Sequence, residues 1–330
     1  MKFIYKHEAH WPILQTIRKS GDGSRGEKDS GLSKQLRDAG NTAFTAKDDD
    51  TALKCYNDAL LAAPADPWDE QGEDMALALA NRSALYFRQE KFSDCLTDTK
   101  LALKTGYPKH LKYKVYQRQA KCLAELNKLK EAKRSYLDAQ NFLNFSKLSK
   151  ELRYNVTNDI QTAIDEISEK EESLSQDGEP DDAVELEPDD TPKLPSFPRN
   201  PKFPSLHQSL TVKYDSARGR HVIATENIKC GTYIACEQPV VSFLWSEKLL
   251  SHCTLCLAPV RSPIPCFTCS CVVFCSQDCR AEAWKTFHQY ECKVKSLNTI
   301  LKNNIFLFLF YFRLWRRWCP GTKIYLLPTG

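Results

Sequence analysis

The apolar positions that follow Ser33 have helical spacing in two successive runs. Residues three or four positions apart lie on one face of an α-helix, so each run predicts an amphipathic helix. The first run comprises Leu36, Ala39, Ala43 and Phe44, and the second comprises Ala52, Leu53, Tyr56, Ala59 and Leu60. Pro64 comes next and cannot continue a helix. The pattern therefore predicts two antiparallel helices that end before Pro64.

The same layout occurs twice more, in LALANRSALYFRQEKFSDCLTDTKLALKTGYP and in YKVYQRQAKCLAELNKLKEAKRSYLDAQNFL. Small residues align between the copies: Ala52, Cys95 and Ala132 at one position, and Ala59, Ala102 and Ala139 at the next. The pattern resembles the tetratricopeptide repeat, with PADPWDEQGED lengthening the first connection. A generic helical bundle is the alternative. We assign residues 33–168 to three repeats and a capping helix, which makes the fold class mainly α, and the resemblance implies a concave peptide-binding groove.

A set of polar and cationic residues is expected to face this groove. The set is Arg37, Asn41, Asn81, Lys114 and Arg118. It resembles the dicarboxylate clamp of repeat proteins that bind the acidic C-terminal tails of cytosolic heat-shock chaperones, with Arg37 where lysine is usual. Cations and amides on rigid helices can hold a terminal and a side-chain carboxylate together. The alternative is a solvated helix face, since charges four residues apart are common there.

Two segments have compositions that favour disorder. Residues 1–32 contain GDGSRGEKDSG and are expected to form a loosely ordered leader. Residues 169–205 are first strongly acidic and then rich in proline, in TPKLPSFPRNPKFP. Such a composition buries too little apolar surface to offset the entropy of ordering, so this stretch is predicted to be a disordered linker.

Residues 206–250 alternate apolar and polar positions, which predicts short strands. We expect Val222 with Ala224, and Tyr233 with Ala235, to form a hairpin that turns at Lys229-Cys230-Gly231. The run SARGRHVIATENIKCGTYIACEQP resembles the opening of a SET domain of lysine methyltransferases. In that family a basic loop with glycine helps to bind S-adenosylmethionine, which implies cofactor contacts for Arg218, Gly219 and Arg220. A second glycine that is usual in the loop is replaced here by His221.

The candidate metal ligands of the sequence are concentrated between residues 253 and 292. Four pairs have metal-ligand spacing: Cys253 with Cys256, Cys266 with Cys269, Cys275 with Cys279, and His288 with Cys292. A C-x2-C knuckle directs two thiolates to one ion, and ligands four residues apart share a helical face. Eight ligands complete two closed sites, which indicates structural zinc and no catalytic water. A disulfide framework or a set of buried thiols is the alternative, and the N-terminus has no secretory pattern that would favour disulfides.

The spacing resembles the MYND finger, to which we assign residues 251–294. The resemblance implies interleaved pairs, with Cys253, Cys256, Cys275 and Cys279 on one ion and Cys266, Cys269, His288 and Cys292 on the other. A RING finger also holds two zinc ions, but its central Cys-x-His is absent here. MYND fingers bind proline-rich peptides, so Gln277, Trp284 and Phe287 are candidate contacts or finger core. Cys271 fits no pair and is either a free thiol or an alternative to Cys269.

Repeats, a SET opening and a MYND finger in this order resemble the SET and MYND protein-lysine methyltransferases, and most of all their repeat-bearing fourth member. The Asn-His pair that binds cofactor in that family is absent from the sequence, and residues 295–330 form an atypical apolar tail. We expect a truncated product that binds zinc and peptides without catalysis, or an S-adenosylmethionine-dependent methyltransferase if a SET core is present in a longer product. An interfacial membrane anchor is the other interpretation of the tail.

Composition excludes two further classes. The chain has 330 residues and a formal net charge of +4, with acidic and basic residues mixed, so no basic stripe for nucleic acid is present. No apolar run reaches the roughly 18 residues that a membrane helix needs. The sequence is consistent with the cytoplasm and the nucleus.

Overall fold

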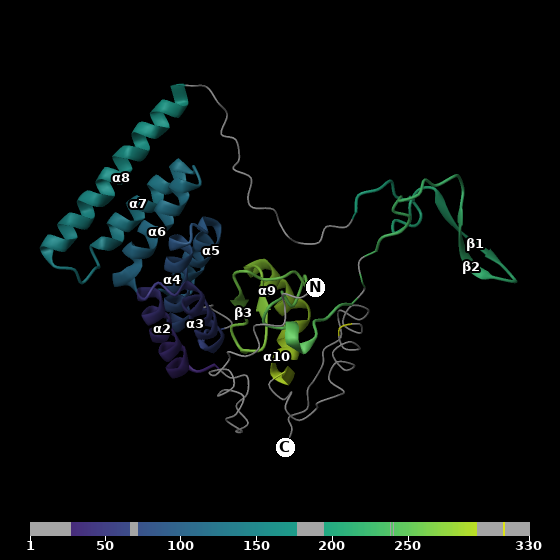
Figure 1. Ribbon diagram of the computed structural model, residues 1–330, viewed down its shortest axis with the longest axis horizontal. Helices are drawn as coiled ribbons and strands as arrows, with labels where there is room; N and C mark the ends of the chain where they lie inside the picture. Colours follow the sequence, from purple (N-terminus) through teal and green to yellow (C-terminus); the bar gives the residue numbers. More distant parts are fainter. Residues whose placement is uncertain are drawn as a thin grey trace, which may run out of the picture. The chain divides into compact units, whose positions relative to one another are not determined.

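The computed structural model describes residues 28–66, 72–176, 195–237, 239, 241–295 and 313. The chain divides into two compact units. One comprises Met1–Asp189 with Leu244–Ile305, and the other comprises Asp190–Phe243 with Phe306–Gly330. The described residues are predominantly helical (Figure 1), so the predicted fold class is confirmed.

The first unit begins with three helical hairpins and a long final helix (Figure 1). The hairpins are α2 (Ser30–Thr45) with α3 (Asp49–Ala62), α4 (Glu73–Arg88) with α5 (Phe92–Lys104), and α6 (Lys112–Glu125) with α7 (Leu129–Leu143). A short 3-10 helix, η1 (Lys109–Leu111), precedes α6, and α8 (Lys150–Gln176) packs on α7. This is the predicted array of tetratricopeptide repeats.

The three hairpin turns are equivalent in detail. Each has one non-glycine residue with a positive φ: Lys47 at 62°, Glu90 at 58° and Asn127 at 55°. In each turn the amide of that residue donates to a carbonyl three residues back, and the next amide donates to a carbonyl five residues back. Three unrelated turn sequences therefore adopt one conformation, as a structural repeat requires.

Small residues allow the helices to cross closely. All six aligned small positions are 0% exposed: Ala52, Cys95, Ala132, Ala59, Ala102 and Ala139. At Gly40 of α2 an added Cβ would lie 2.5 Å from Cε1 of Tyr56 on α3, so that crossing requires glycine. The repeat positions chosen from the sequence are thus core positions.

The boundaries differ from those expected. Helix α2 begins at Ser30, because the Asp29 carboxylate caps it by accepting from the amide of Leu32 at 2.9 Å. Helix α8 buries Ile160, Ile164 and Ile167 against the third repeat. It continues past residue 169 to Gln176, because the glutamate and lysine residues of that stretch favour helix. The predicted leader up to residue 27 and the linker residues 177–194 lie outside the described residues.

The second unit contains one antiparallel hairpin, and its register corrects the expectation. Strand β1 (Leu210–Asp215) pairs with β2 (Gly219–Ala224), with Leu210 opposite Ala224. The hairpin predicted between Val222 and Tyr233 is wrong. The Asp215 carboxylate accepts from the amides of Ala217 and Arg218 at 3.0 and 2.7 Å, and this Asx turn reverses the chain one strand earlier than predicted.

The finger completes the first unit. It contains η2 (Ser246–Lys248), β3 (Ile264–Pro265) paired with β4 (Val273–Phe274), α9 (Gln277–Ala283), a π-helical turn η3 (Trp284–His288) and α10 (Gln289–Lys295). Of the predicted tail, only Lys295 and Arg313 are among the described residues. No helix of the described part has the length and apolar character to cross a membrane.

Candidate metal centres and peptide groove

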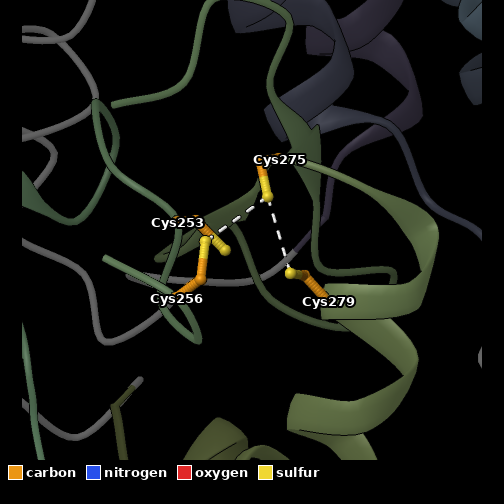
Figure 2. A group of neighbouring side chains, drawn as sticks. All are labelled: Cys253, Cys256, Cys275 and Cys279. Atoms are coloured by element: carbon orange, nitrogen blue, oxygen red, sulfur yellow. Dashed lines mark hydrogen bonds between the residues drawn. The ribbon is translucent and has the colours of Figure 1, made fainter. Parts of the chain in front are cut away.

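The first candidate metal centre consists of four cysteines (Figure 2): Cys253, Cys256, Cys275 and Cys279. Their sulfur atoms all lie within 4.8 Å of one another, with Cys256 and Cys279 each 3.5 Å from Cys275. A knuckle positions the first pair, because the Leu257 amide donates to the Cys253 carbonyl at 2.9 Å. Helix α9, capped by Ser276, positions Cys279 in its first turn.

The second candidate centre is fully buried and consists of Cys266, Cys269, His288 and Cys292. The Cys266 and Cys292 sulfurs are 3.9 Å apart, and the Cys269 sulfur lies 3.7 Å from Nε2 of His288. The backbone amide of Thr268 donates to the Cys266 sulfur at 3.3 Å. Cys271 lies outside both four-residue groups of the described residues.

Both donor sets fit zinc. A tetrahedral site with Zn–S bonds of about 2.3 Å has S–S edges of about 3.8 Å. The observed separations of 3.5 and 3.9 Å agree with that edge and are far from the roughly 2.0 Å of a disulfide. All the cysteines involved are free thiols. The structure thus groups the eight ligands as the MYND resemblance implied, and the Cys/His clusters support zinc binding.

Protonation in the clusters reflects their crowding. Burial lowers the pKa of His288, but hydrogen bonds to Cys266 and Cys269 outweigh it and raise that pKa to about 9. Hydrogen bonds from neighbouring thiols hold the pKa of Cys269 well below its usual range. Zinc binding must release the protons of these groups, because thiolate and neutral imidazole are the forms that bind the metal.

Lys28 lies next to the second centre. Burial lowers its pKa to about 8, while the nearby thiols of Cys266 and Cys269 oppose the shift. Its ammonium donates to the Leu61 carbonyl at 2.9 Å. A buried cation here suits the negative charge of a site with three thiolates.

The helical array holds the finger through one buried guanidinium. Arg82 donates to both carboxylate oxygens of Asp98 at 2.7 Å, to Oδ1 of Asn57 at 2.7 Å and to the Pro263 carbonyl of the finger at 3.0 Å. Both charged side chains are 0% exposed. Burial alone lowers the pKa of Arg82, but Asp98 raises it above its usual value, so the pair is ionised.

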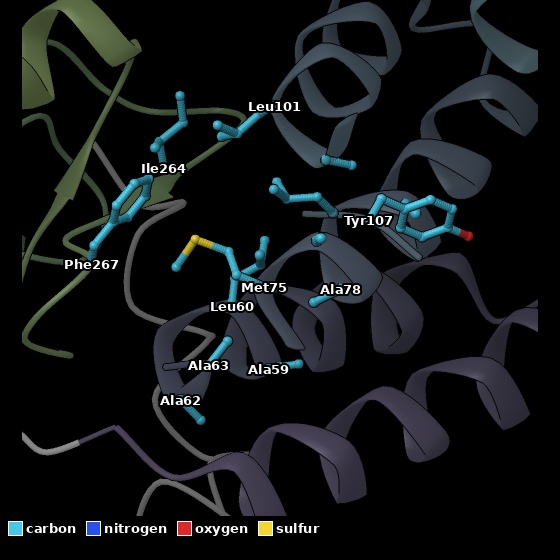
Figure 3. Packing of buried hydrophobic residues seen from close by; sticks show 14 of the residues in the cluster. Ala59, Leu60, Ala62, Ala63, Met75, Ala78, Leu101, Tyr107, Ile264 and Phe267 are labelled. Carbon is cyan, nitrogen blue, oxygen red and sulfur yellow. The ribbon is translucent and has the colours of Figure 1, made fainter. Parts of the chain in front are cut away.

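Apolar packing completes this junction (Figure 3). Ile264 and Phe267 of the finger are 0% and 2% exposed and belong to the core cluster of the first two repeats, with Leu60, Met75 and Leu101. The Phe267 ring also lies 3.8 Å from the Arg280 guanidinium. Sequence reasoning missed this interface, because Arg82 and Asp98 look like ordinary polar positions of solvated helices.

The groove residues converge in part. Nδ2 of Asn81 and the hydroxyl of Tyr56 both donate to Oδ1 of Asn41 at 2.9 Å. Arg118 donates to the Ala80 carbonyl at 2.8 Å and to the Ser83 hydroxyl at 2.7 Å. Asn41, Asn81 and Arg118 therefore meet at one stretch of α4.

The other two groove residues differ from this group. Lys114 is exposed one helical turn before Arg118. Arg37 is on α2, and its guanidinium lies 3.4 Å from the carboxylate of Asp74 in the first turn of α4. An ion pair within the array thus already uses Arg37.

The structure also describes the candidate peptide contacts of the finger and the candidate cofactor contacts near β2. Trp284 and Phe287 are partly buried against the finger's own cluster, which matches the core interpretation, and Gln277 is half-buried at the start of α9. Arg218, Gly219 and Arg220 lie where the β1–β2 turn enters β2, with Gly219 at a φ of 67°. The Arg218 guanidinium pairs with the Asp215 carboxylate at 2.8 Å.

These features define a tetratricopeptide protein with a Cys/His zinc finger. The family model of the MYND finger matches residues 253–292. The chain is 27% identical to protein-lysine N-methyltransferase SMYD4 of Gallus gallus over 83% of this chain and 38% of that protein, and 28% identical to SMYD4 of Homo sapiens over 82% and 35%. The chain is thus a relative of the SET and MYND protein-lysine methyltransferases, as its sequence predicted, and spans little more than a third of these curated relatives.

One solved structure among those similar to the array is the first TPR domain of Spaghetti (RPAP3) bound to the HSP90 peptide SRMEEVD. It is 28% identical, covers 42% of this chain and 97% of its own, and has a TM-score of 0.31.

Proposed function

We propose that this chain is a protein-interaction module whose repeat groove binds acidic C-terminal peptides, next to a finger folded by two structural zinc ions. The observation that carries the proposal is the cluster of Asn41, Asn81 and Arg118 around α4. Oδ1 of Asn41 already accepts two hydrogen bonds, which leaves its amide hydrogens as donors toward the groove. Arg118 and the exposed Lys114 add positive charge on the same face of α6.

This set suits a ligand with two carboxylates. Amide and cationic donors on rigid helices lose little entropy when they bind, and hydrogen bonds to charged groups contribute about 1.5–3 kcal/mol each. C-terminal tails of cytosolic heat-shock chaperones are ligands of this kind, and we propose them as partners.

The test is isothermal titration of the zinc-loaded chain with the peptide SRMEEVD and with its C-terminal amide. We expect binding of the free acid, at least tenfold weaker binding of the amide, and a loss of about 10- to 100-fold for Lys114→Ala. Lys130→Ala is the matched control, because Lys130 is also exposed but lies on α7, outside the predicted clamp. Equal affinity for acid and amide, or equal effects of the two variants, would exclude the clamp.

For the finger we propose proline-rich peptides as ligands, on the basis of its MYND similarity. Gln277 is its half-buried polar candidate contact, whereas Trp284 and Phe287 pack on the finger cluster. A titration with a proline-rich peptide, compared for the native chain and Gln277→Ala, tests this assignment. The cytoplasm and the nucleus are the proposed compartments, which imaging of the tagged chain would check.

The lysine methyltransferase activity that names these relatives favours a second candidate, S-adenosylmethionine-dependent protein-lysine N-methylation by a longer product. In it, Arg218, Gly219 and Arg220 would contact the cofactor. For the present chain we propose binding without catalysis, because cofactor and substrate must be held in reacting geometry and the sequence has no Asn-His pair. Calorimetric titration with S-adenosylmethionine and a methyl-transfer assay distinguish the two candidates, since saturable binding with turnover would favour the enzyme.

A further inference from the structure

A small cavity lies between α3 and the finger. Its volume is about 260 Å³, below the roughly 300–1,000 Å³ of small-molecule sites, so it suits one side chain. Helix α3 supplies one wall, which includes Leu53, Leu60 and Leu61. The finger supplies the other, with Leu250, Pro263, Pro265 and Val273.

The walls of this junction pocket are fixed before any ligand arrives. Arg82 holds them together, because one terminal nitrogen of its guanidinium donates to Asn57 on α3 and to the Pro263 carbonyl on the finger. Pro265 pairs with Val273 in the β3–β4 ladder. A preformed pocket saves the ordering cost that a flexible surface would incur on binding.

The pocket is apolar but carries a net negative charge. Its charged lining residues are Asp50, Lys54 and Asp58, all on α3. Among the residues that the structure describes, none donates a hydrogen bond to the Asp58 carboxylate. Burial raises the pKa of Asp58 to about 6, with the field of Lys54 opposing the shift. The half-buried Asp58 is therefore mostly ionised at neutral pH.

We propose that the junction pocket binds one lysine side chain of a partner protein. The four-carbon stem of lysine would pack against the leucine, proline and valine walls, and its ammonium would reach Asp58. A purely apolar guest would leave the carboxylate desolvated without a partner, and an anion would be repelled. The site is separate from the groove of the proposed function, since Asp58 lies on α3 and the clamp residues meet at α4.

The thermal stability of the Asp58→Asn variant distinguishes a ligand-binding role of Asp58 from a structural role. A carboxylate with a raised folded-state pKa disfavours folding once it is ionised, and this penalty is present above about pH 6 and absent below about pH 4. Asp58→Asn should therefore raise the melting temperature at pH 7 and leave it unchanged near pH 4. If Asp58 instead formed a structural ion pair with Lys54, the same variant would be less stable at pH 7, and that result would overturn the proposal.

The binding test uses the zinc-loaded full chain and three acetylated, amidated pentapeptides with lysine, norleucine or arginine between glycines. Norleucine keeps the stem and removes the ammonium. Binding is followed by nuclear magnetic resonance titration, with Asp58→Asn as the variant and Asp38→Asn, an exposed carboxylate on α2 outside the pocket, as the control. We expect the lysine peptide to bind at least tenfold more tightly than norleucine, and Asp58→Asn alone to remove that preference.

Equal binding of lysine and norleucine, tighter binding of arginine, or an unchanged preference in Asp58→Asn would each refute the proposal. So would a complete lack of binding by the lysine peptide. Because the peptides have no free carboxylate, failure of the groove proposal would not affect this result.

Discussion

Removal of zinc should destabilise the helical array as well as the finger. Cys266 and Cys269 belong to the second candidate zinc centre, and Phe267 lies between these two residues in the sequence. Its ring and Ile264 are buried in the core cluster of the first two repeats (Figure 3). If the finger unfolds without its metal, the array loses both side chains from its core.

The magnitude follows from this burial. A fully buried phenylalanine or isoleucine contributes about 1.5–3 kcal/mol, so the array should lose about 3–6 kcal/mol. Loss of the hydrogen bond from Arg82 to the Pro263 carbonyl adds nothing to this figure, because the guanidinium N–H can then donate to water. Domains of this size lose about 2–4 °C in melting temperature per kcal/mol, so even 3 kcal/mol corresponds to about 6–12 °C.

The assay is thermal unfolding followed by far-ultraviolet circular dichroism, with and without a zinc chelator. The array dominates this signal, because α9 and α10 have only seven residues each. The variant Ile264→Ala/Phe267→Ala is the control. It should retain zinc, because the finger has its own core cluster, yet it should melt near the temperature of the chelated native chain.

The reasoning would be refuted if chelation released zinc and left the melting temperature of the native array unchanged. It would also fail if chelation lowered the melting temperature of the control variant as much as that of the native chain. In that case zinc would stabilise the array by a route that does not use Ile264 and Phe267.

Two further predictions concern buried charge and protons. Asp98→Asn leaves the Arg82 guanidinium without its counter-charge and should reduce the free energy of unfolding by about 3–5 kcal/mol in urea titrations, whereas Asp38→Asn should have little effect. Zinc affinity, measured by competition with a chromophoric chelator, should fall as pH decreases from about 9 to 6, because His288 must lose its proton to bind and its pKa is about 9. Constant affinity over this range would contradict this release of protons on zinc binding.

The sequence predicted features that depend on local spacing. Small residues such as Ala59, Ala102 and Ala139 mark helix crossings, and all are fully buried. The pairs C-x2-C and H-x3-C are local as well, and the structure brings them into two groups. The grouping of pairs across about twenty residues came from family resemblance, since spacing alone leaves it open.

Non-local features could not be predicted in this way. The contact of Arg82 with Pro263 joins positions 181 residues apart, and no periodicity encodes it. The wrong hairpin has a different cause. The alternation of apolar and polar residues identified β2 correctly. The Asx turn at Asp215 determines that β1 is its partner strand, and this turn leaves no trace in the alternation pattern.

The junction between array and finger also fixes an order of events during synthesis. Pro263 is 181 positions after Arg82, and this length of chain takes roughly 9–36 s to emerge at about 5–20 residues per second. Throughout that interval the face that will receive Ile264 and Phe267 is uncovered while the repeats can already fold. A nascent chain therefore presents an apolar surface to chaperones until the finger has appeared and acquired metal.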